Sequence, residues 1–170
     1  MALLDQALEN SKNLFSTGEF ITKLGSLVNI VTDSKNALSA DDLTSYYTDG
    51  LSDILAELSI QTEIIDNPIK NAPPFLIGKR IESSELKTIL LYGHGDTVPL
   101  QKELWNEGIS PNELKIIDEK IYGRGVADNK GQHLTNLMAL LSVLKTRKKL
   151  GFNIKIIFEM GEEVGSPGLF

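Results

Sequence analysis

The chain contains no cysteine among its 170 residues, so disulfide bonds and thiolate metal ligands are excluded. No uninterrupted apolar run approaches the ~18 residues that a membrane-spanning helix needs, so no membrane partner is expected. Basic residues are in the minority, 17 against 23 acidic ones, which gives a formal net charge of -6. A mildly acidic chain without a basic stripe repels phosphate backbones, so nucleic acid is not expected as a partner either.

The start of the chain shows no targeting signal. Its first twenty residues carry Asp5, Glu9 and Glu19 and lack the apolar stretch of a signal peptide. The hydrophobic fraction of 41% and the charged fraction of 24% are ordinary for a globular protein. These features predict a globular domain located in the cytoplasm.

Apolar periodicity predicts helices in the first 60 residues and strands after them. One helical face spans residues 20–31, after candidate N-caps at 16–17, and a second spans 43–58. Ser39 and Asp42 resemble a capping box ahead of the second helix.

Short apolar runs bounded by proline, glycine or polar turns predict the strands. The runs are QTEII (61–65), FLIGKRI (75–81), KTILLY (87–92) and NIKIIFEM (153–160), with a hairpin over 114–125 and a helix from Gly131 that stops at Gly151. Helices that alternate with apolar strands predict an α/β fold, with a mixed, mostly parallel β-sheet flanked by helices.

Three loops combine glycines with acids or with one of the two histidines. They are GHGD (93–96), GRGVADNKG (123–131) and EMGEEVGS (159–166). Ligands of open α/β sheets gather beyond the carboxyl ends of the strands, and two of these loops follow strong strands. We therefore expect one crevice to hold His94, Asp96, Asp128, Glu162 and Glu163.

An imidazole and four carboxylates crowded into one crevice would require a positive ion among them. Without sulfur ligands, the candidates are zinc, cobalt or manganese. Asp96 lies two residues after His94, so in an extended loop its carboxylate could brace the second ring nitrogen of the histidine. Glu162 and Glu163 are adjacent, so one could bind metal while the other handles a proton.

Each of these signals has a plain alternative. A lone histidine between glycines is often a surface or capping residue, and a Glu pair is usually a solvated face. The GRGVADNKG loop could bind phosphate, but its glycines do not match G-x-G-x-x-G and no P-loop Lys-Ser/Thr follows. Only the conjunction of the three loops, in this order, favours a metal site.

The blocks GHGDTVP, IYGRGVADNKG and EMGEEVGSPG resemble the N-terminal signature blocks of the M20 metallopeptidase family. That family includes acetylornithine deacetylase, succinyl-diaminopimelate desuccinylase, carboxypeptidases and carnosine dipeptidases. The resemblance covers roughly residues 90–168 and implies a zinc-exopeptidase-like catalytic domain. Other di-zinc aminopeptidases fit the second and third blocks less well.

The resemblance implies a role for each site residue. His94, Asp128 and Glu163 would bind metal, with Asp128 shared between two zinc ions. Asp96 would orient His94, and Glu162 would be the general base that activates water for attack on an amide or peptide bond. His133 departs from the small residues common after this block, and we expect it to be structural or to support a ligand.

The resemblance also implies that this chain is a truncated catalytic domain. Residues 1–60 would form its helical segment and 61–170 its sheet and metal-site loops. The lid or dimerisation domain and the C-terminal part, with two further ligands, would be absent. Each of the two zinc ions of a complete site would then keep two of three protein ligands.

The predicted function is zinc-dependent hydrolysis of dipeptides or N-acyl amino acids, with the chain alone nearly inactive. The alternative is a non-catalytic fragment or interaction module that retains the fold. Missing strands would leave an exposed sheet edge, so homo-oligomers or other self-association are expected.

Overall fold

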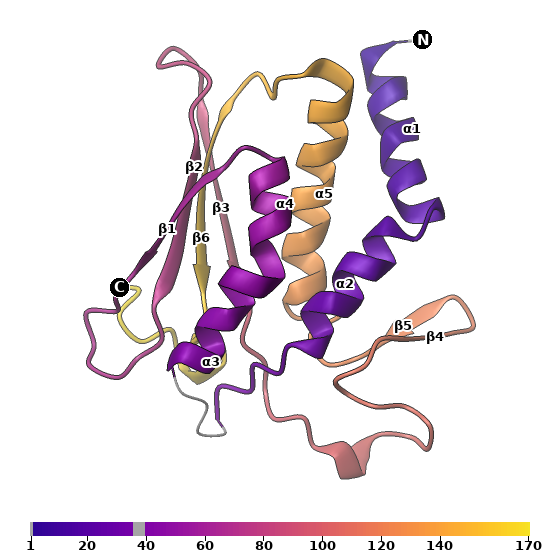
Figure 1. The fold of residues 1–170 in the computed structure, drawn as a ribbon, viewed down its shortest axis with the longest axis vertical. Coiled ribbons are helices and arrows are strands. Elements are labelled where there is room, and N and C mark those ends of the chain that lie inside the picture. Colours follow the sequence, from indigo (N-terminus) through magenta and orange to yellow (C-terminus); the bar gives the residue numbers. More distant parts are fainter. Residues whose placement is uncertain (1, 36–39) are drawn as a thin grey trace.

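The computed structural model describes residues 2–35 and 40–170, and Figure 1 shows helices packed beside a four-stranded sheet. The helices are α1 (Leu3–Ser16), α2 (Glu19–Asn29), α3 (Ala40–Ser45), α4 (Ser52–Glu57) and α5 (Lys130–Arg147), with a π-helical segment at Tyr46–Leu51 that joins α3 to α4. The strands are β1 (Gln61–Ile65), β2 (Phe75–Arg80), β3 (Thr88–His94), β4 (Lys115–Ile117), β5 (Lys120–Tyr122) and β6 (Asn153–Glu159).

The main sheet has the strand order β1-β2-β6-β3 and is mixed, as predicted. The expectation that most of its strands run parallel does not hold for these four strands. β1 pairs antiparallel with β2, and β2 pairs antiparallel with β6. Of these strands only β3 and β6 run parallel, and the connection between them contains α5, the kind of crossover that a parallel pair requires.

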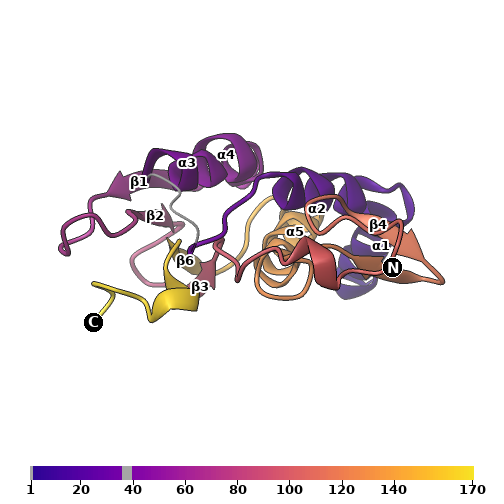
Figure 2. The same ribbon diagram turned by 90° about the horizontal axis from the view of Figure 1, so that it is seen from below.

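One face of this sheet carries the helices. Figure 2, which turns the molecule by 90°, shows α3 and α4 over β1 and β2, with α5 beside β3 and β6. The side chains of β6 alternate accordingly: Ile154, Ile156 and Phe158 are buried, whereas Lys155 is exposed. In turn, α1 and α2 pack against α5. No helix within 2–35 and 40–170 covers the other face, where Leu90 and Tyr92 of β3 are exposed.

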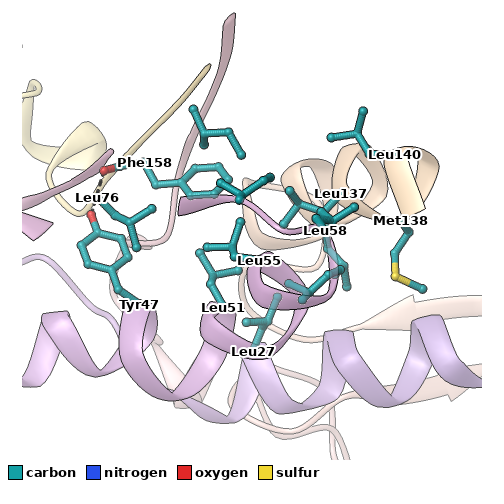
Figure 3. Packing of buried hydrophobic residues seen from close by; sticks show 14 of the residues in the cluster. Leu27, Tyr47, Leu51, Leu55, Leu58, Leu76, Leu137, Met138, Leu140 and Phe158 are labelled. Atoms are coloured by element: carbon teal, nitrogen blue, oxygen red, sulfur yellow. Dashed lines mark hydrogen bonds between the residues drawn. The ribbon is translucent and has the colours of Figure 1, made fainter. Parts of the chain in front are cut away.

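The core lies between the sheet and its helices (Figure 3). Leu51, Leu55 and Leu58 reach it from the helical segment, and Leu137 reaches it from α5. Each fully buried side chain of this kind stabilises the fold by about 1.5–3 kcal/mol relative to an exposed one. This packing fixes α5 against β3, and the start of α5 lies at one of the three acid-bearing loops.

Most of the predicted elements are confirmed, including β1 and the hairpin of β4 and β5. The sequence patterns missed α1, and α2 follows Gly18 rather than residues 16–17. The α5 helix ends at a left-handed Lys148, three residues before the predicted stop at Gly151. The proposed capping box depends on Ser39, which lies outside the described residues. Across the described part of the chain, no helix is both long and apolar enough to cross a bilayer.

Candidate metal centre

The carboxyl ends of β3 and β6 start two of the acid-bearing loops side by side. The two strands are parallel neighbours, and their register places His94 opposite Glu159. The backbone N–H of Gly95 then donates to the carbonyl of Glu159 at 2.9 Å. The loop after β3 and the loop after β6 therefore leave the sheet together, as expected for a ligand crevice at strand ends.

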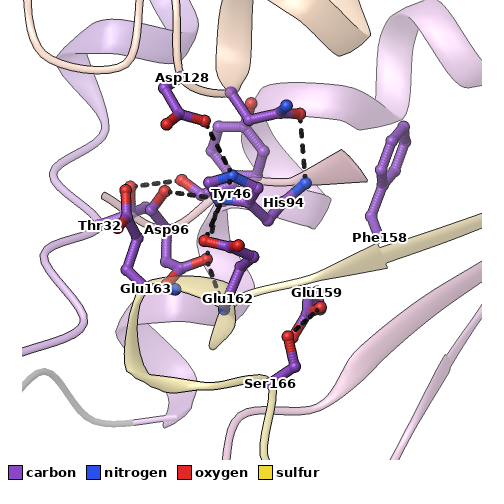
Figure 4. Close-up of polar contacts among 12 residues, drawn as sticks. Thr32, Tyr46, His94, Asp96, Asp128, Phe158, Glu159, Glu162, Glu163 and Ser166 are labelled. Carbon is purple, nitrogen blue, oxygen red and sulfur yellow. Dashed lines mark hydrogen bonds and ion pairs between the residues drawn. The ribbon is translucent and has the colours of Figure 1, made fainter. Parts of the chain in front are cut away.

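The third loop delivers Asp128 at the start of α5. His94 Nε2 lies 3.1 Å from Asp128 Oδ1 (Figure 4), although the two residues are far apart in sequence. The imidazole is nearly buried, with 4% of its side chain exposed, whereas 71% of the Asp128 side chain is exposed. The histidine is therefore held by the protein, and the carboxylate faces solvent.

Glu162 and Glu163 lie on a 3-10 turn, Glu162–Val164, directly after β6. Glu162 Oε2 is 3.8 Å from His94 Nε2. Ligand atoms of His94, Glu162 and Glu163 all lie within 4.8 Å of one another. The structure thus brings together the residues predicted from three loops, while their individual roles stay predictions.

Asp96 contacts both His94 and the turn that carries the two glutamates. It is fully buried, and its Oδ1 lies 3.3 Å from His94 Nδ1, whose ring nitrogen is also 3.1 Å from the Asp96 carbonyl oxygen. The two oxygens of the same carboxylate accept the backbone N–H groups of Glu162 at 3.2 Å and Glu163 at 3.1 Å. One side chain therefore fixes both the imidazole ring and the turn that carries the glutamates.

The charges of the cluster shift two pKa values. Burial opposes a charge on His94, but hydrogen bonds and attraction from Asp96, with Glu162, outweigh it and raise the pKa of His94 to about 9. Burial, and then the neighbouring charge of Asp128, raises the pKa of Glu163, which His94 partly offsets. The cluster therefore favours a positive charge at its centre and resists additional negative charge.

The donor set suits a divalent metal. Zinc bonds of about 2.0–2.2 Å to nitrogen and oxygen place two ligand atoms up to ~4.4 Å apart. The distances of 3.1 Å and 3.8 Å from His94 Nε2 to Asp128 and Glu162 fall within that span. Imidazole with carboxylates, and no thiolate, fits zinc, cobalt or manganese.

Two buried ionisable side chains near the cluster were not singled out from the sequence. Glu159 accepts the hydroxyl of Tyr92 at 2.5 Å and that of Ser166 at 2.9 Å, which ties the glutamate loop back to β3. Lys130 is almost fully buried and donates to the carbonyls of Leu27 at 2.9 Å and Ile30 at 2.7 Å. The only sequence signal for either was its place inside one of the three blocks.

His133 lies on α5 behind the cluster and does not belong to the group of metal-ligand atoms. Its ring contacts Tyr46 on one side and Asn129 on the other. His133 is therefore buried and makes polar contacts outside the group of ligand atoms, which is consistent with the structural or supporting role expected for it.

Comparisons with known proteins agree with this geometry. Residues 90–169 match the model of peptidase family M20/M25/M40. A mouse Beta-Ala-His dipeptidase is 38% identical over 99 residues, which cover 57% of this chain and 20% of that protein. A Candida albicans Cys-Gly metallodipeptidase is 35% identical over 128 residues, which cover 71% of this chain and 25% of that protein.

The fold is also similar to that of a solved structure. The crystal structure of human carnosine dipeptidase 1 matches with a TM-score of 0.84 and 28% identity, over 99% of this chain and 37% of that one. The chain thus spans between a fifth and two fifths of the length of these relatives.

Proposed function

Because residues 90–169 belong to peptidase family M20/M25/M40, we propose that the chain carries part of the active site of a metal-dependent hydrolase. The substrates are small amides or peptides, such as dipeptides or N-acyl amino acids. The observation that carries this proposal is the approach of Asp128, Glu162 and Glu163 to one nearly buried imidazole, that of His94.

Within this proposal, His94, Asp128 and Glu163 would hold metal, and a complete site would hold two zinc ions. When bound, zinc would supply a Lewis acid for the amide carbonyl and would lower the pKa of water. Asp96 holds the His94 ring in the orientation that presents Nε2 to the crevice, because its carboxylate and carbonyl both face Nδ1.

Glu162 is the proposed general base. Its side chain is 44% exposed, so a water molecule and a substrate can reach it. Its carboxylate takes a proton from the attacking water and passes that proton to the amine that leaves when the C–N bond breaks. Asp96 fixes the backbone of Glu162, which keeps the base close to the imidazole.

The adjacent glutamates provide a matched pair of variants. Glu163→Gln is expected to lower the affinity for Zn²⁺ or Co²⁺, whereas Glu162→Gln keeps metal binding and loses the base. Equilibrium dialysis with either metal measures the first effect. The assignment is wrong if Glu162→Gln loses metal and Glu163→Gln retains it.

We further propose that this chain alone binds metal weakly and hydrolyses substrates slowly. Each of two zinc ions would have two protein ligands here, His94 with Asp128 and Asp128 with Glu163, and catalytic zinc usually has three. An assay of dipeptides and N-acyl amino acids with added zinc or cobalt tests this. Robust turnover by the 170-residue chain that disappears in Glu162→Ala would contradict it.

A non-catalytic module that retains the fold is the competing proposal. The metal content of the purified chain, compared with that of His94→Ala, separates the two. Equal and negligible metal in both proteins, even after incubation with excess zinc, would favour the module. Metal in the wild type alone favours the hydrolase.

Self-association through the sheet belongs to the same proposal. The outer edge of β3 is unpaired within the described residues, and Leu90 is 60% exposed beside it. Unpaired edges and exposed apolar patches promote association between copies. Sedimentation of the wild type and of Leu90→Lys measures it, with a monomeric wild type as the contrary result.

A further inference from the structure

A chain of three polar side chains lies behind the candidate metal centre and joins the π-helical segment Tyr46–Leu51, α5 and the Asp128 loop. The Tyr46 hydroxyl is 2.6 Å from His133 Nε2, and His133 Nδ1 is 3.1 Å from Asn129 Oδ1. Tyr46 is fully buried and His133 is 2% exposed. We call these residues the Tyr46–His133–Asn129 relay.

The hydrogen-bond partners allow one assignment of the protons in this relay. Asn129 Nδ2 donates to Gln132 Oε1 at 2.9 Å, so Asn129 Oδ1 is the acceptor that faces His133. His133 Nδ1 therefore carries the proton, and Nε2 accepts from the Tyr46 hydroxyl. Burial, with the positive charges of His94 and Lys130, lowers the pKa of His133 to about 3, which agrees with a neutral ring.

The relay ends at the metal centre itself. Asn129 Oδ1 accepts the backbone N–H of His94 at 3.4 Å, in addition to the ring N–H of His133. Asn129 also follows Asp128 directly in the chain. A single amide oxygen therefore holds the backbone of one proposed metal ligand, and its residue directly follows another in the chain. His133 and Gln132 together orient this amide.

The close packing of the relay explains why glycine stands on either side of His94. A Cβ atom at Gly93 would lie 2.9 Å from His133 Cβ and 3.1 Å from Asn129 Oδ1. A Cβ atom at Gly95 would lie 2.4 Å from two ring atoms of Tyr46. The strand end that carries His94 thus rests directly on the relay, with no room for side chains between them.

We propose that Tyr46 and His133 are positioning residues of the metal centre, which act through Asn129 on His94 and Asp128. The proposal rests on the proposed function and adds to it two side chains that lie outside the metal-ligand group. Residues that hydrogen-bond a metal ligand directly typically contribute about 10–100-fold to metal affinity. Tyr46 and His133 act through Asn129, so their effect is expected at the lower end of that range.

Two neighbouring tyrosines allow a controlled test. Tyr46→Phe removes the hydroxyl at the end of the relay. Tyr47→Phe removes an equally buried hydroxyl, which donates to the carbonyls of Phe158 at 2.9 Å and Pro74 at 3.2 Å. It keeps the ring that packs edge-on against Tyr46. In titrations of the whole chain with Co²⁺, followed by visible absorption, we expect about 10-fold weaker binding for Tyr46→Phe and unchanged binding for Tyr47→Phe.

Variants of His133 provide a rescue. The side-chain amide of His133→Asn can keep the donor that faces Asn129, whereas His133→Leu loses it. The Co²⁺ affinity of His133→Asn is expected to lie between those of the wild type and His133→Leu. Equal affinities for both variants, or for Tyr46→Phe and Tyr47→Phe, would overturn the proposal while leaving the metal centre intact.

Nitrogen NMR of the side chains tests the relay without metal. The chain has two histidines, so His94→Ala identifies the ring signals of His133. A neutral Nδ1–H tautomer that persists from about pH 5 to about pH 8 supports the relay, and a proton on Nε2 overturns it. A wild type that binds neither Co²⁺ nor Zn²⁺ would overturn the proposed function and the positioning role together, whatever the tautomer.

Discussion

Acidification tests the burial of His133 in a quantitative way. The pKa of this side chain is lowered from 6.5 to about 3 in the folded chain, first by burial and then by His94 and Lys130. Between these two pH values the unfolded chain binds a proton that the folded chain does not bind. The free energy of unfolding therefore falls as the pH drops below 6.5, and the loss stops near pH 3.

The size of the effect follows from the two pKa values. Each pH unit inside the window costs up to about 1.36 kcal/mol. From about pH 7 to about pH 5, only the unfolded-state titration matters, and the loss is about 2 kcal/mol. Other groups titrate in the same range, so the wild type must be compared with a variant that lacks the imidazole.

His133→Asn is that variant, because it removes the titrating ring and can keep a donor to Asn129. Urea unfolding at several pH values, followed by circular dichroism, gives the free energy of unfolding for both proteins. The wild type is expected to lose about 2 kcal/mol more than His133→Asn between about pH 7 and about pH 5. Parallel pH profiles would show that His133 titrates normally in the folded chain, which would refute its buried neutral state.

Three further outcomes are expected. Gly95→Ala forces a Cβ against the Tyr46 ring and should lower the free energy of unfolding by about 1–3 kcal/mol in urea unfolding. Gly25→Ala is the control and should not lower it, because its Cβ would have an ordinary nearest contact of 3.8 Å. Leu137→Ala empties a fully buried position of α5 and should cost about 2–5 kcal/mol by the same measurement. Zinc at 100 times its dissociation constant should stabilise the wild type by about 2.7 kcal/mol in thermal unfolding, and a similar shift in His94→Ala would contradict the assigned ligand.

Sequence patterns located the strands well because most of them are short apolar runs and all have clear ends. The stretch QTEII coincides with β1, Gln61–Ile65, and the proline loop that follows marks its end. The order of the strands was less accessible. β6 lies between β2 and β3, which are neighbours in sequence, and only long-range packing decides such an insertion.

The first helix escaped prediction for a physical reason. Most apolar side chains of α1 face solvent, with Leu4 69% exposed and Leu8 54% exposed, and Leu14 is the one buried residue that the helix contributes. Its apolar pattern therefore carries little information about a core. Thr17, taken as an N-cap of the next helix, instead donates its hydroxyl to the Asn13 carbonyl and helps to close α1.

The clustering of the candidate metal-centre residues could be predicted because they occur in compact blocks. The side chains that support them from behind could not be predicted in this way. Tyr46 lies 48 positions before His94, on a π-helical segment that periodicity cannot distinguish from an ordinary helix. Its hydroxyl meets His133 only after this segment and α5 have packed together. Contacts that depend on the packing of two helices leave no local signature in the sequence.

Burying the hydroxyl of Tyr46 and the imidazole of His133 costs desolvation free energy, which indicates that these groups have a specific role. An apolar pair at Tyr46 and His133 could fill the same space without the desolvation that a hydroxyl and an imidazole suffer. Such a pair would leave Asn129 Oδ1 without the N–H of His133, so only Gln132 would still orient the amide that accepts the backbone N–H of His94. Buried networks in which every partner is satisfied restrict a core to one arrangement. The polar relay therefore gives the strand end at His94 a single geometry, which a metal centre assembled from three separate loops requires.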